Sequence, residues 1–239
     1  MRLRELRDIY LNQDIYIVGS GPTANLFPME FLRDKICLGL NDAYKIHPAI
    51  APIVLMNHQL YAHAGKKVTA PYHENFKNIK YPILKPASRY KIEKIEWDHP
   101  YFYCFDRTQK IQDLWNLTKD TDYLYYSPQG CSLHPALQVC WIMGAKNIFV
   151  LGCDSRTIGG NHYANYDKND FGVVARERNY DAYVYGTLIV QKFLQTKGVN
   201  VINLSPIVGY HMIDYQHEVL KGEISTDSLV KDIKKLKNV

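Results

Sequence analysis

Short apolar runs in this chain each end abruptly in small or polar residues. The runs are rich in β-branched residues and do not alternate apolar with polar positions, a pattern typical of parallel strands buried on both faces. In an open parallel sheet, ligands bind beyond the carboxyl ends of the strands. The residues that follow the runs are therefore the first candidates for a site. The runs occupy 15–18, 36–40, 53–56, 147–151 and 199–203.

The segments between the runs predict helices and shorter strands. We expect a helix that opens near Pro22, because proline suits a first helical position. Two longer helices are expected at 132–143 and 181–197. Short strands are expected in a less regular, tyrosine-rich stretch, at 81–84, 101–105 and 123–126.

Together these elements predict an α/β fold, a Rossmann-like, mostly parallel sheet with helices on both faces and a smaller irregular lid region. We expect a single domain over 1–217. The polar loop at 155–179 is long for a compact domain, which predicts a functional, lid-like segment. A polar tail helix is expected at 218–239.

Composition narrows the class of protein. The 239 residues are 46% hydrophobic and 22% charged, as in ordinary soluble proteins. No apolar stretch approaches the roughly 20 residues that cross a bilayer, and no apolar segment follows the basic N-terminus, so we expect a cytoplasmic protein. The net charge of +5 leaves peripheral attachment to a membrane open. The five cysteines form no Cys-x-x-Cys pair and are expected to be small buried hydrophobes.

The first apolar run leads into the loop Gly19-Ser20-Gly21-Pro22-Thr23. Two glycines let the main chain approach an anion, and the following helix start offers N–H groups and the positive end of its dipole. The motif is neither a Walker loop nor Gly-x-Gly-x-x-Gly. It predicts binding of a nucleotide phosphate, with a tight strand–helix turn as the alternative.

Other candidate ligand contacts follow later strands. Asn41 directly follows the second run and Asn57 the third. An asparagine there offers a donor and an acceptor, as contact with a ribose hydroxyl or a base edge requires, and a plain turn residue is the alternative. Gly130, Cys131 and Ser132 open the helix at 132–143 and offer a second set of N–H donors. A simple N-cap is the alternative for Ser132.

The fourth run leads into Gly152-Cys153-Asp154, and the polar loop that follows carries Arg156, His162 and Tyr163. Asp154 joins the candidate nucleotide-binding residues. Arg156 and Tyr163 are suited to neutralise charge on a departing phosphate. His162 is a candidate general base, because its ordinary pKa lies near neutral pH, and an exposed loop histidine is the alternative.

No metal site is expected. Asp120-Thr121-Asp122 has the Asp-x-Asp form of many sugar-nucleotide transferases, but it precedes a predicted strand instead of closing one, which favours an Asx-type turn. The histidines lack the spacing of metal ligands.

The order of these motifs resembles that of the bacterial lipooligosaccharide sialyltransferases. It is also similar to the wider group that includes the flagellin-modifying motility accessory factors and the archaeal hydroxymethylpterin diphosphokinase-like proteins. The resemblance covers about residues 14–206. It implies that the first loop binds the nucleotide phosphate through Gly19, Gly21 and Pro22, with Ser20 in the place of a family asparagine. It also implies that Asn41 and Asn57 contact the nucleotide.

The same resemblance implies a metal-independent reaction in which Tyr163 assists phosphate departure, with Arg156 near the place of a second family tyrosine. The family histidine precedes the last long helix, and no histidine occurs at 175–181 in this chain. The base would then be His162, Glu177 or another group.

The leading hypothesis is a glycosyltransferase that moves a sugar from a nucleotide-sugar donor to an acceptor hydroxyl, without a cofactor. The acceptor would be a glycan or another hydroxyl compound, and the mild positive charge leaves an anionic acceptor open, DNA included. One alternative is an ATP-dependent diphosphokinase of the hydroxymethylpterin type, which would need Mg²⁺. Another is a non-catalytic nucleotide-binding module. The sequence leaves a homo-oligomer open.

Overall fold

The computed structural model describes residues 2–50, 53–56, 78–84, 103–104, 106–127, 131–154 and 180–204. Its strands are β1 (Asp14–Val18), β2 (Ile36–Leu40), β3 (Ile53–Met56), β4 (Tyr81–Leu84), β5 (Tyr103–Cys104), β6 (Asp106–Thr108), β7 (Tyr123–Tyr125), β8 (Asn147–Leu151) and β9 (Asn200–Asn203). The α-helices are α1 (Ile111–Trp115), α2 (Leu133–Ile142) and α3 (Tyr180–Thr196). Short 3-10 helices are η1 (Leu3–Leu6), η2 (Pro22–Leu26), η3 (Met29–Leu32), η4 (Asn41–Lys45) and η5 (Pro48–Ile50).

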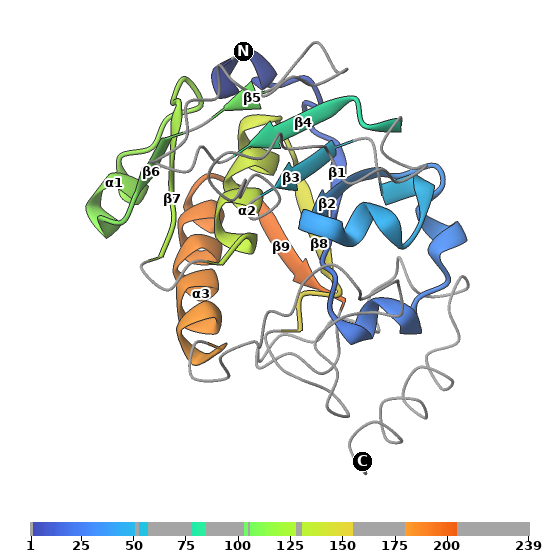
Figure 1. The fold of residues 1–239 in the computed structure, drawn as a ribbon. Helices are drawn as coiled ribbons and strands as arrows, with labels where there is room; N and C mark the ends of the chain where they lie inside the picture. The colour runs from blue at the N-terminus through green and yellow to red at the C-terminus, as the bar shows by residue number, and fades with distance from the viewer. Residues whose placement is uncertain are drawn as a thin grey trace, which may run out of the picture.

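Seven strands form one sheet in the order β5-β4-β3-β2-β1-β8-β9, and all paired neighbours run parallel (Figure 1). The chain builds outward from β1 to β5 and then returns to place β8 on the other side of β1. Strands β6 and β7 form a separate parallel pair. The prediction of an α/β fold with a mostly parallel sheet is confirmed.

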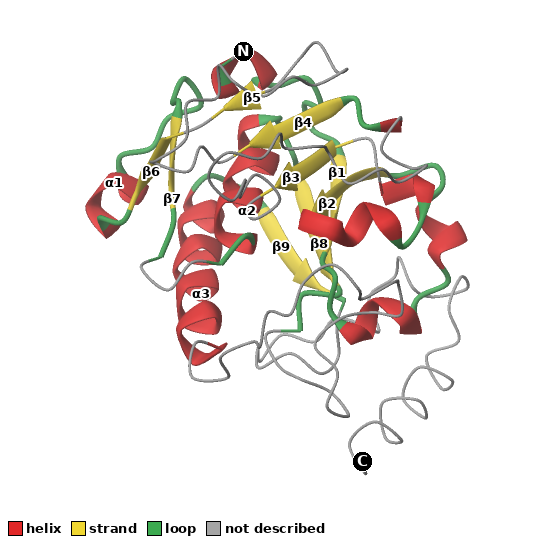
Figure 2. Cartoon of the chain, in the orientation of Figure 1, coloured by secondary structure: helices red, strands yellow, loops and turns green. Residues whose placement is uncertain are grey.

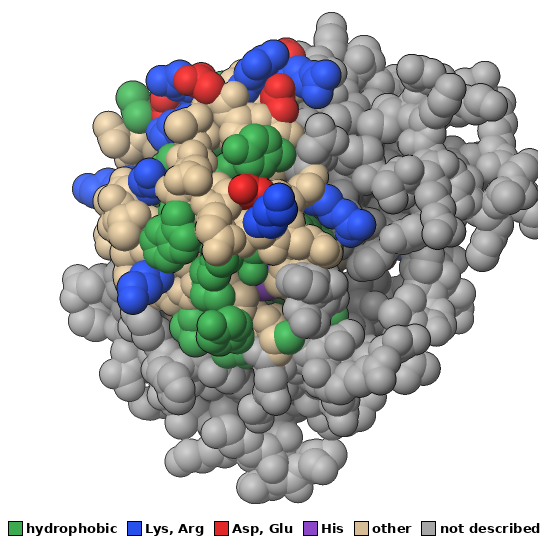
Figure 3. Space-filling view, turned by 90° about the vertical axis from the view of Figure 1, so that its left-hand side faces the viewer, with side chains coloured by type: hydrophobic (Ala, Val, Ile, Leu, Met, Phe, Trp, Pro, Cys, Tyr) green, Lys and Arg blue, Asp and Glu red, His purple; other side chains and the backbone are tan. Residues whose placement is uncertain are grey.

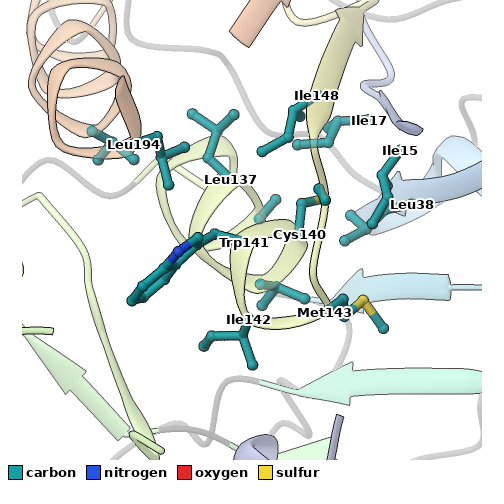
Figure 4. Close-up of a cluster of buried hydrophobic side chains, with 14 of the residues drawn as sticks. Ile15, Ile17, Leu38, Leu137, Cys140, Trp141, Ile142, Met143, Ile148 and Leu194 are labelled. Atoms are coloured by element: carbon teal, nitrogen blue, oxygen red, sulfur yellow. The ribbon is translucent and has the colours of Figure 1, made fainter. Parts of the chain in front are cut away.

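Both faces of the central strands are covered, which explains why the apolar runs do not alternate. Ile15 and Ile17 lie in the cluster beneath α2 and α3 (Figure 4). Tyr16 and Val18, which point the other way, pack in a second cluster with residues of η3 to η5. Tyr16 stacks on Phe149 of β8 with ring centroids 4.7 Å apart. Helices α2 and α3 therefore lie on one side of the sheet, together with η1, and η3 to η5 lie on the other (Figure 2).

Helix α2 is buried on all sides, whereas the sequence pattern suggested one apolar face. All ten of its residues are buried, including His134 and Gln138. The Gln138 side chain accepts a hydrogen bond from the Tyr125 N–H and donates one to the Tyr125 C=O, each at 2.8 Å. Its carboxamide thereby pairs with the edge of β7 as a neighbouring strand would, which satisfies the backbone of Tyr125.

Several local predictions needed correction. The helix expected near Pro22 is the five-residue 3-10 helix η2. The strand expected at 101–105 is β5, and β6 and α1 follow it where the sequence had predicted no element. The loop at 155–179 and the tail at 218–239 lie outside the described residues. Within the described ranges, none of the helices has both the length and the apolar composition needed to cross a bilayer.

Candidate functional site

The β1–β8 pair is the topological switch point of the sheet. Strand β2 lies on one side of β1 and β8 on the other, so the chain leaves β1 and β8 in different directions at their carboxyl ends. Crevices that bind ligands in open parallel sheets form at such points. The loops that meet there are 19–23 after β1 and 152–154 after β8. Both had been singled out from the sequence.

The two loops are joined by a series of hydrogen bonds. The N–H of Gly19 donates to the C=O of Leu151 and the N–H of Gly21 to the C=O of Gly152, each at 2.8 Å. The N–H of Thr23 donates to Oδ2 of Asp154 at 2.8 Å. The Thr23 hydroxyl donates to the other oxygen of the same carboxylate. Three main-chain donors that a phosphate would use are thus engaged by the end of β8.

The close approach of the two loops explains why positions 19 and 21 are occupied by glycine. A Cβ atom on Gly19 would lie 2.3 Å from the Gly152 oxygen, and one on Gly21 would lie 2.6 Å from Oδ2 of Asp154. Neither contact is sterically possible. Gly152 itself has a φ of 66°, which glycine adopts without strain. The sequence offered a phosphate loop or a tight turn, and the geometry accounts for the glycines through the turn, while phosphate binding stays a prediction.

Asp154 is the buried charge of the site. It is 3% exposed. Burial raises its pKa from 3.8 to about 6, while the two hydrogen bonds from Thr23 act in the opposite direction. We refer to Thr23 and Asp154 as the Thr23–Asp154 clasp. The clasp joins positions 131 apart in the chain, so it fixes the β1 loop against the end of β8.

A second contact links β2 to α2. Asn41 has a φ of 50°, a left-handed conformation that asparagine tolerates better than most residues. Its Nδ2 donates to Oγ of Ser132 at 3.2 Å. Ser132 stands at the N-cap position of α2 but makes no side-chain capping bond among the described residues. Ser132 is thus the N-cap by position, as the alternative proposed, while its hydroxyl accepts the bond from Asn41 after β2.

The cysteines of the site are not activated nucleophiles. Burial raises the pKa of Cys131 to about 11, although the backbone N–H groups of Leu133 and His134 bond to its thiol and oppose the shift. Burial, followed by the neighbouring Cys131 and Asp154, raises the pKa of Cys153 well above its ordinary value. Both thiols are protonated at neutral pH, and a thiol is a much weaker nucleophile than a thiolate.

The predicted site residues divide into two sets. The structure brings Gly19 to Thr23 together with Asp154, and Asn41 together with Ser132, all at the carboxyl edge of the sheet. Cys131 and Ser132 open α2 as expected. The remaining predicted residues lie outside the described residues: Asn57, Gly130, Arg156, His162 and Tyr163.

The sequence analysis missed His134, which is fully buried in the first turn of α2. Its Nε2–H donates to the C=O of Tyr183 at 3.0 Å, and its Nδ1 has no hydrogen-bond partner among the described residues. Burial lowers its pKa to about 4, so the ring is neutral at physiological pH. A Cβ on Gly186 would lie 2.3 Å from its Cε1. A histidine and a glycine in otherwise apolar helices were the available signals.

The Asp-x-Asp segment lies just before β7 and is held by ion pairs to two arginines near the N-terminus, which precede β1. Asp120 pairs with Arg7 at 2.6 Å, and Asp122 pairs with Arg4 at 3.6 Å. Thr121 forms a local turn through its hydroxyl and the Tyr123 N–H, at 3.1 Å. Among the described residues, no group of three or more His, Cys, Asp or Glu side chains could hold a metal ion.

A hollow of about 520 Å³ lies away from the switch point. It is lined by residues in or next to η3 and η5 and by the residue before β2: Glu30, Arg33, Lys35, His47, Pro48 and Ala49. These residues stand at the amino ends of β2 and β3, where parallel sheets rarely bind ligands. We therefore retain the switch point as the candidate site.

No family model matches the chain, and no curated protein or solved structure shows a significant match to it. The interpretation of the site consequently depends on the geometry above and on the motif order in the sequence.

Proposed function

We propose that the switch point binds a nucleotide-sugar donor and that the protein transfers its glycosyl group to an acceptor hydroxyl. The observation that supports this most is that three polar segments lie at the carboxyl edge of the neighbouring strands β1 and β2. They are the β1 loop around Ser20, Asn41 after β2, and the start of α2 at Ser132. Such an edge suits a ligand that carries phosphates, hydroxyls and a base.

The Thr23–Asp154 clasp limits the positions that the phosphates of a bound donor could occupy. Since the amides of Gly19, Gly21 and Thr23 are engaged by β8, we expect the donor phosphate over Ser20 and the positive end of the α2 dipole. The nucleoside would then contact the carboxamide of Asn41. Both oxygens of the Asp154 carboxylate already accept hydrogen bonds from Thr23, so the carboxylate does not need other donors at the site.

The proposed reaction forms one bond and breaks one. The acceptor oxygen bonds to the anomeric carbon, and the bond from that carbon to the phosphate oxygen breaks, so the nucleotide leaves with the electron pair. We assign His162 to take the acceptor proton, and Arg156 and Tyr163 to stabilise the charge on the leaving phosphate. If so, Arg156→Ala lowers kcat far more than it lowers donor affinity.

A thermal-shift comparison of CMP-, UDP-, GDP- and ADP-linked sugars, with and without Mg²⁺, tests donor binding. A donor present at 100 times its Kd stabilises the fold by about 2.7 kcal/mol, which for a chain of this size corresponds to roughly 5–10 °C in Tm. We expect one nucleotide class to produce this shift without Mg²⁺. A shift with ATP that requires Mg²⁺ would support the diphosphokinase instead. No shift with any donor contradicts the proposal.

Asn41→Ala tests the location of the site, with Asn12→Ala as a matched control. Both asparagines have left-handed backbones, with φ of 50° and 59°, so alanine brings similar strain at both. Asn12 lies beside Gly144, whose C=O accepts its N–H, at the amino edge of the sheet. We expect Asn41→Ala to weaken donor binding about tenfold, as the loss of one polar contact does, and Asn12→Ala to leave it unchanged. Equal effects of the two substitutions on donor affinity would place the donor elsewhere.

A further inference from the structure

One side of the molecule exposes large hydrophobic residues. Among the described residues, six large hydrophobic side chains are more than a third exposed, and four of them lie on α1, β7 and α3. They are Trp115 (41%), Tyr123 (41%), Tyr185 (68%) and Leu188 (38%). Isolated exposed hydrophobic residues are common, but several on neighbouring elements indicate an interaction surface.

The exposed residues of α3 lie in a stripe along its outer surface. Tyr185, Leu188 and Lys192 are spaced by three and four positions and are all exposed, so they lie along one side of the helix. Val190, Phe193 and Leu194, on the other side, are fully buried beneath it. Trp115 of α1 is tied to the same helix, because its ring meets Phe193 edge-on with centroids 6.0 Å apart.

The charges on this side are mostly positive once ion pairs are taken into account. Four basic residues are exposed and have no ion-pair partner in the part of the chain that the structure describes: Arg107, Lys110, Lys192 and Lys197. The nearby carboxylates are engaged, since Asp120 and Asp122 pair with Arg7 and Arg4. Asp113 accepts a hydrogen bond from the Thr108 hydroxyl. Figure 3 looks on to this side and shows hydrophobic and basic side chains interspersed across it.

We infer that this surface, which we call the α3 face (Trp115, Tyr123, Tyr185, Leu188, Arg107, Lys110, Lys192 and Lys197), binds the surface of an anionic lipid bilayer. Exposed Trp and Tyr rings favour the headgroup region, leucine gains by entering the acyl boundary, and lysine and arginine are attracted to anionic headgroups. A single-stranded nucleic acid would use the rings and the cations but would gain nothing from Leu188. A second copy would bring the same four cations against each other. The inference does not depend on the proposed function.

Vesicle co-sedimentation of the full chain tests the inference. We expect binding to vesicles of phosphatidylcholine mixed with phosphatidylserine, and much weaker binding to phosphatidylcholine alone. Lys192→Gln should weaken binding about fivefold, as the loss of one basic residue near an anionic surface does. The matched control is Arg33→Gln, which changes the net charge equally just after η3, across the sheet, and should have no effect. Tyr185→Ser with Leu188→Ser should weaken binding at least about tenfold.

Tryptophan fluorescence gives a second measurement that a folding defect would not imitate. Trp115 is 41% exposed, whereas Trp141 is 5% exposed and packed under Lys197. The chain has a third tryptophan, Trp97, so the measurement is made in a Trp97→Phe background, and we expect vesicles with brominated acyl chains to quench the emission of that protein. Trp115→Phe should remove this component while binding and the circular-dichroism melting curve stay close to those of the wild type.

Several results would overturn the inference. Equal binding to neutral and anionic vesicles would contradict attraction of the basic residues to anionic headgroups. Equal effects of Lys192→Gln and Arg33→Gln on binding would contradict the location of the binding surface on the α3 face. Binding of single-stranded DNA but not of vesicles, weakened by the same substitutions, would assign the α3 face to nucleic acid. A dimer in solution that Tyr185→Ser with Leu188→Ser dissociates, with no vesicle binding, would assign it to a second copy of the chain.

Discussion

The buried carboxyl of Asp154 should leave a clear signature in the pH dependence of stability. Its pKa is 3.8 when unperturbed and about 6 in the folded protein, because burial disfavours the charged form. Below pH 4 both states hold the proton, and the contribution of the neutral carboxyl to stability is fully present. As the pH rises from 4 to 6 the unfolded chain releases its proton first, so this contribution is lost. The loss is about 3 kcal/mol, at 1.36 kcal/mol per pKa unit.

His134 acts in the opposite direction over almost the same range. Its pKa falls from 6.5 to about 4 on folding, again because burial disfavours the charged form. Its contribution is fully present above pH 6.5 and is lost as the pH falls to 4, since the unfolded chain then binds a proton that the folded protein does not. The magnitude is also about 3 kcal/mol. Between pH 4 and 6 the two contributions therefore nearly cancel in the wild-type protein.

Asp154→Asn removes one side of this balance and keeps a side chain that can bond to Thr23. Relative to the wild type, we expect the free energy of unfolding of the variant to rise by about 3 kcal/mol between pH 4 and 6. Urea unfolding followed by circular dichroism at half-unit pH steps measures this difference, and the other titrating groups largely cancel in it.

His134→Gln is the matched comparison, because it removes the opposing titration and keeps a polar side chain at Tyr183. Its free energy of unfolding, relative to the wild type, should fall over pH 4 to 6.5. The reasoning is refuted if the difference between Asp154→Asn and the wild type is constant across this range, because the carboxyl would then titrate alike in both states.

Three further substitutions test the packing around the site and the helices. Gly21→Ala places a methyl 2.6 Å from the Asp154 carboxylate, so we expect a loss of about 2 kcal/mol in chemical denaturation, and an unchanged midpoint would contradict the close packing. Gly186→Ala places a methyl 2.3 Å from the His134 ring and should lower the free energy of unfolding by about 1–3 kcal/mol, despite the better helix propensity of alanine. In a double-mutant cycle His134→Ala should reduce this loss, and additive effects of the two substitutions would contradict the contact. Gln138→Leu leaves an N–H and a C=O of β7 unsatisfied and should cost about 2–5 kcal/mol, much more than Gln112→Leu on the exposed side of α1.

The large elements could be predicted from the sequence because burial decides them. The runs at 15–18 and 36–40 are apolar at consecutive positions since α2 and α3 cover one face of the sheet and η3 to η5 cover the other. Helix α2 could be located, but its full burial could not, because His134 and Gln138 are polar and reveal their role only when Tyr183 and Tyr125 are in place.

The short elements and the site contacts could be predicted only in part. Helix α1 (Ile111–Trp115) has too few residues to show a helical period, and β6 is three residues long. The positions of Gly19, Asn41 and Asp154 at strand ends followed from the parallel-sheet rule. Their partners did not, because each bond joins segments that are distant in the chain and local pattern carries no information about such pairs.

The order of the strands has a consequence for synthesis on the ribosome. Strand β1 lies in the interior of the sheet, yet its neighbour β8 and the clasp partner Asp154 are made about 130 residues later. Until then the nascent chain carries β1 with one open edge, and contacts of such long sequence separation form slowly. The switch point is thus among the last parts of the sheet to be completed, and a chain that stops before residue 147 would have no partner for that edge of β1.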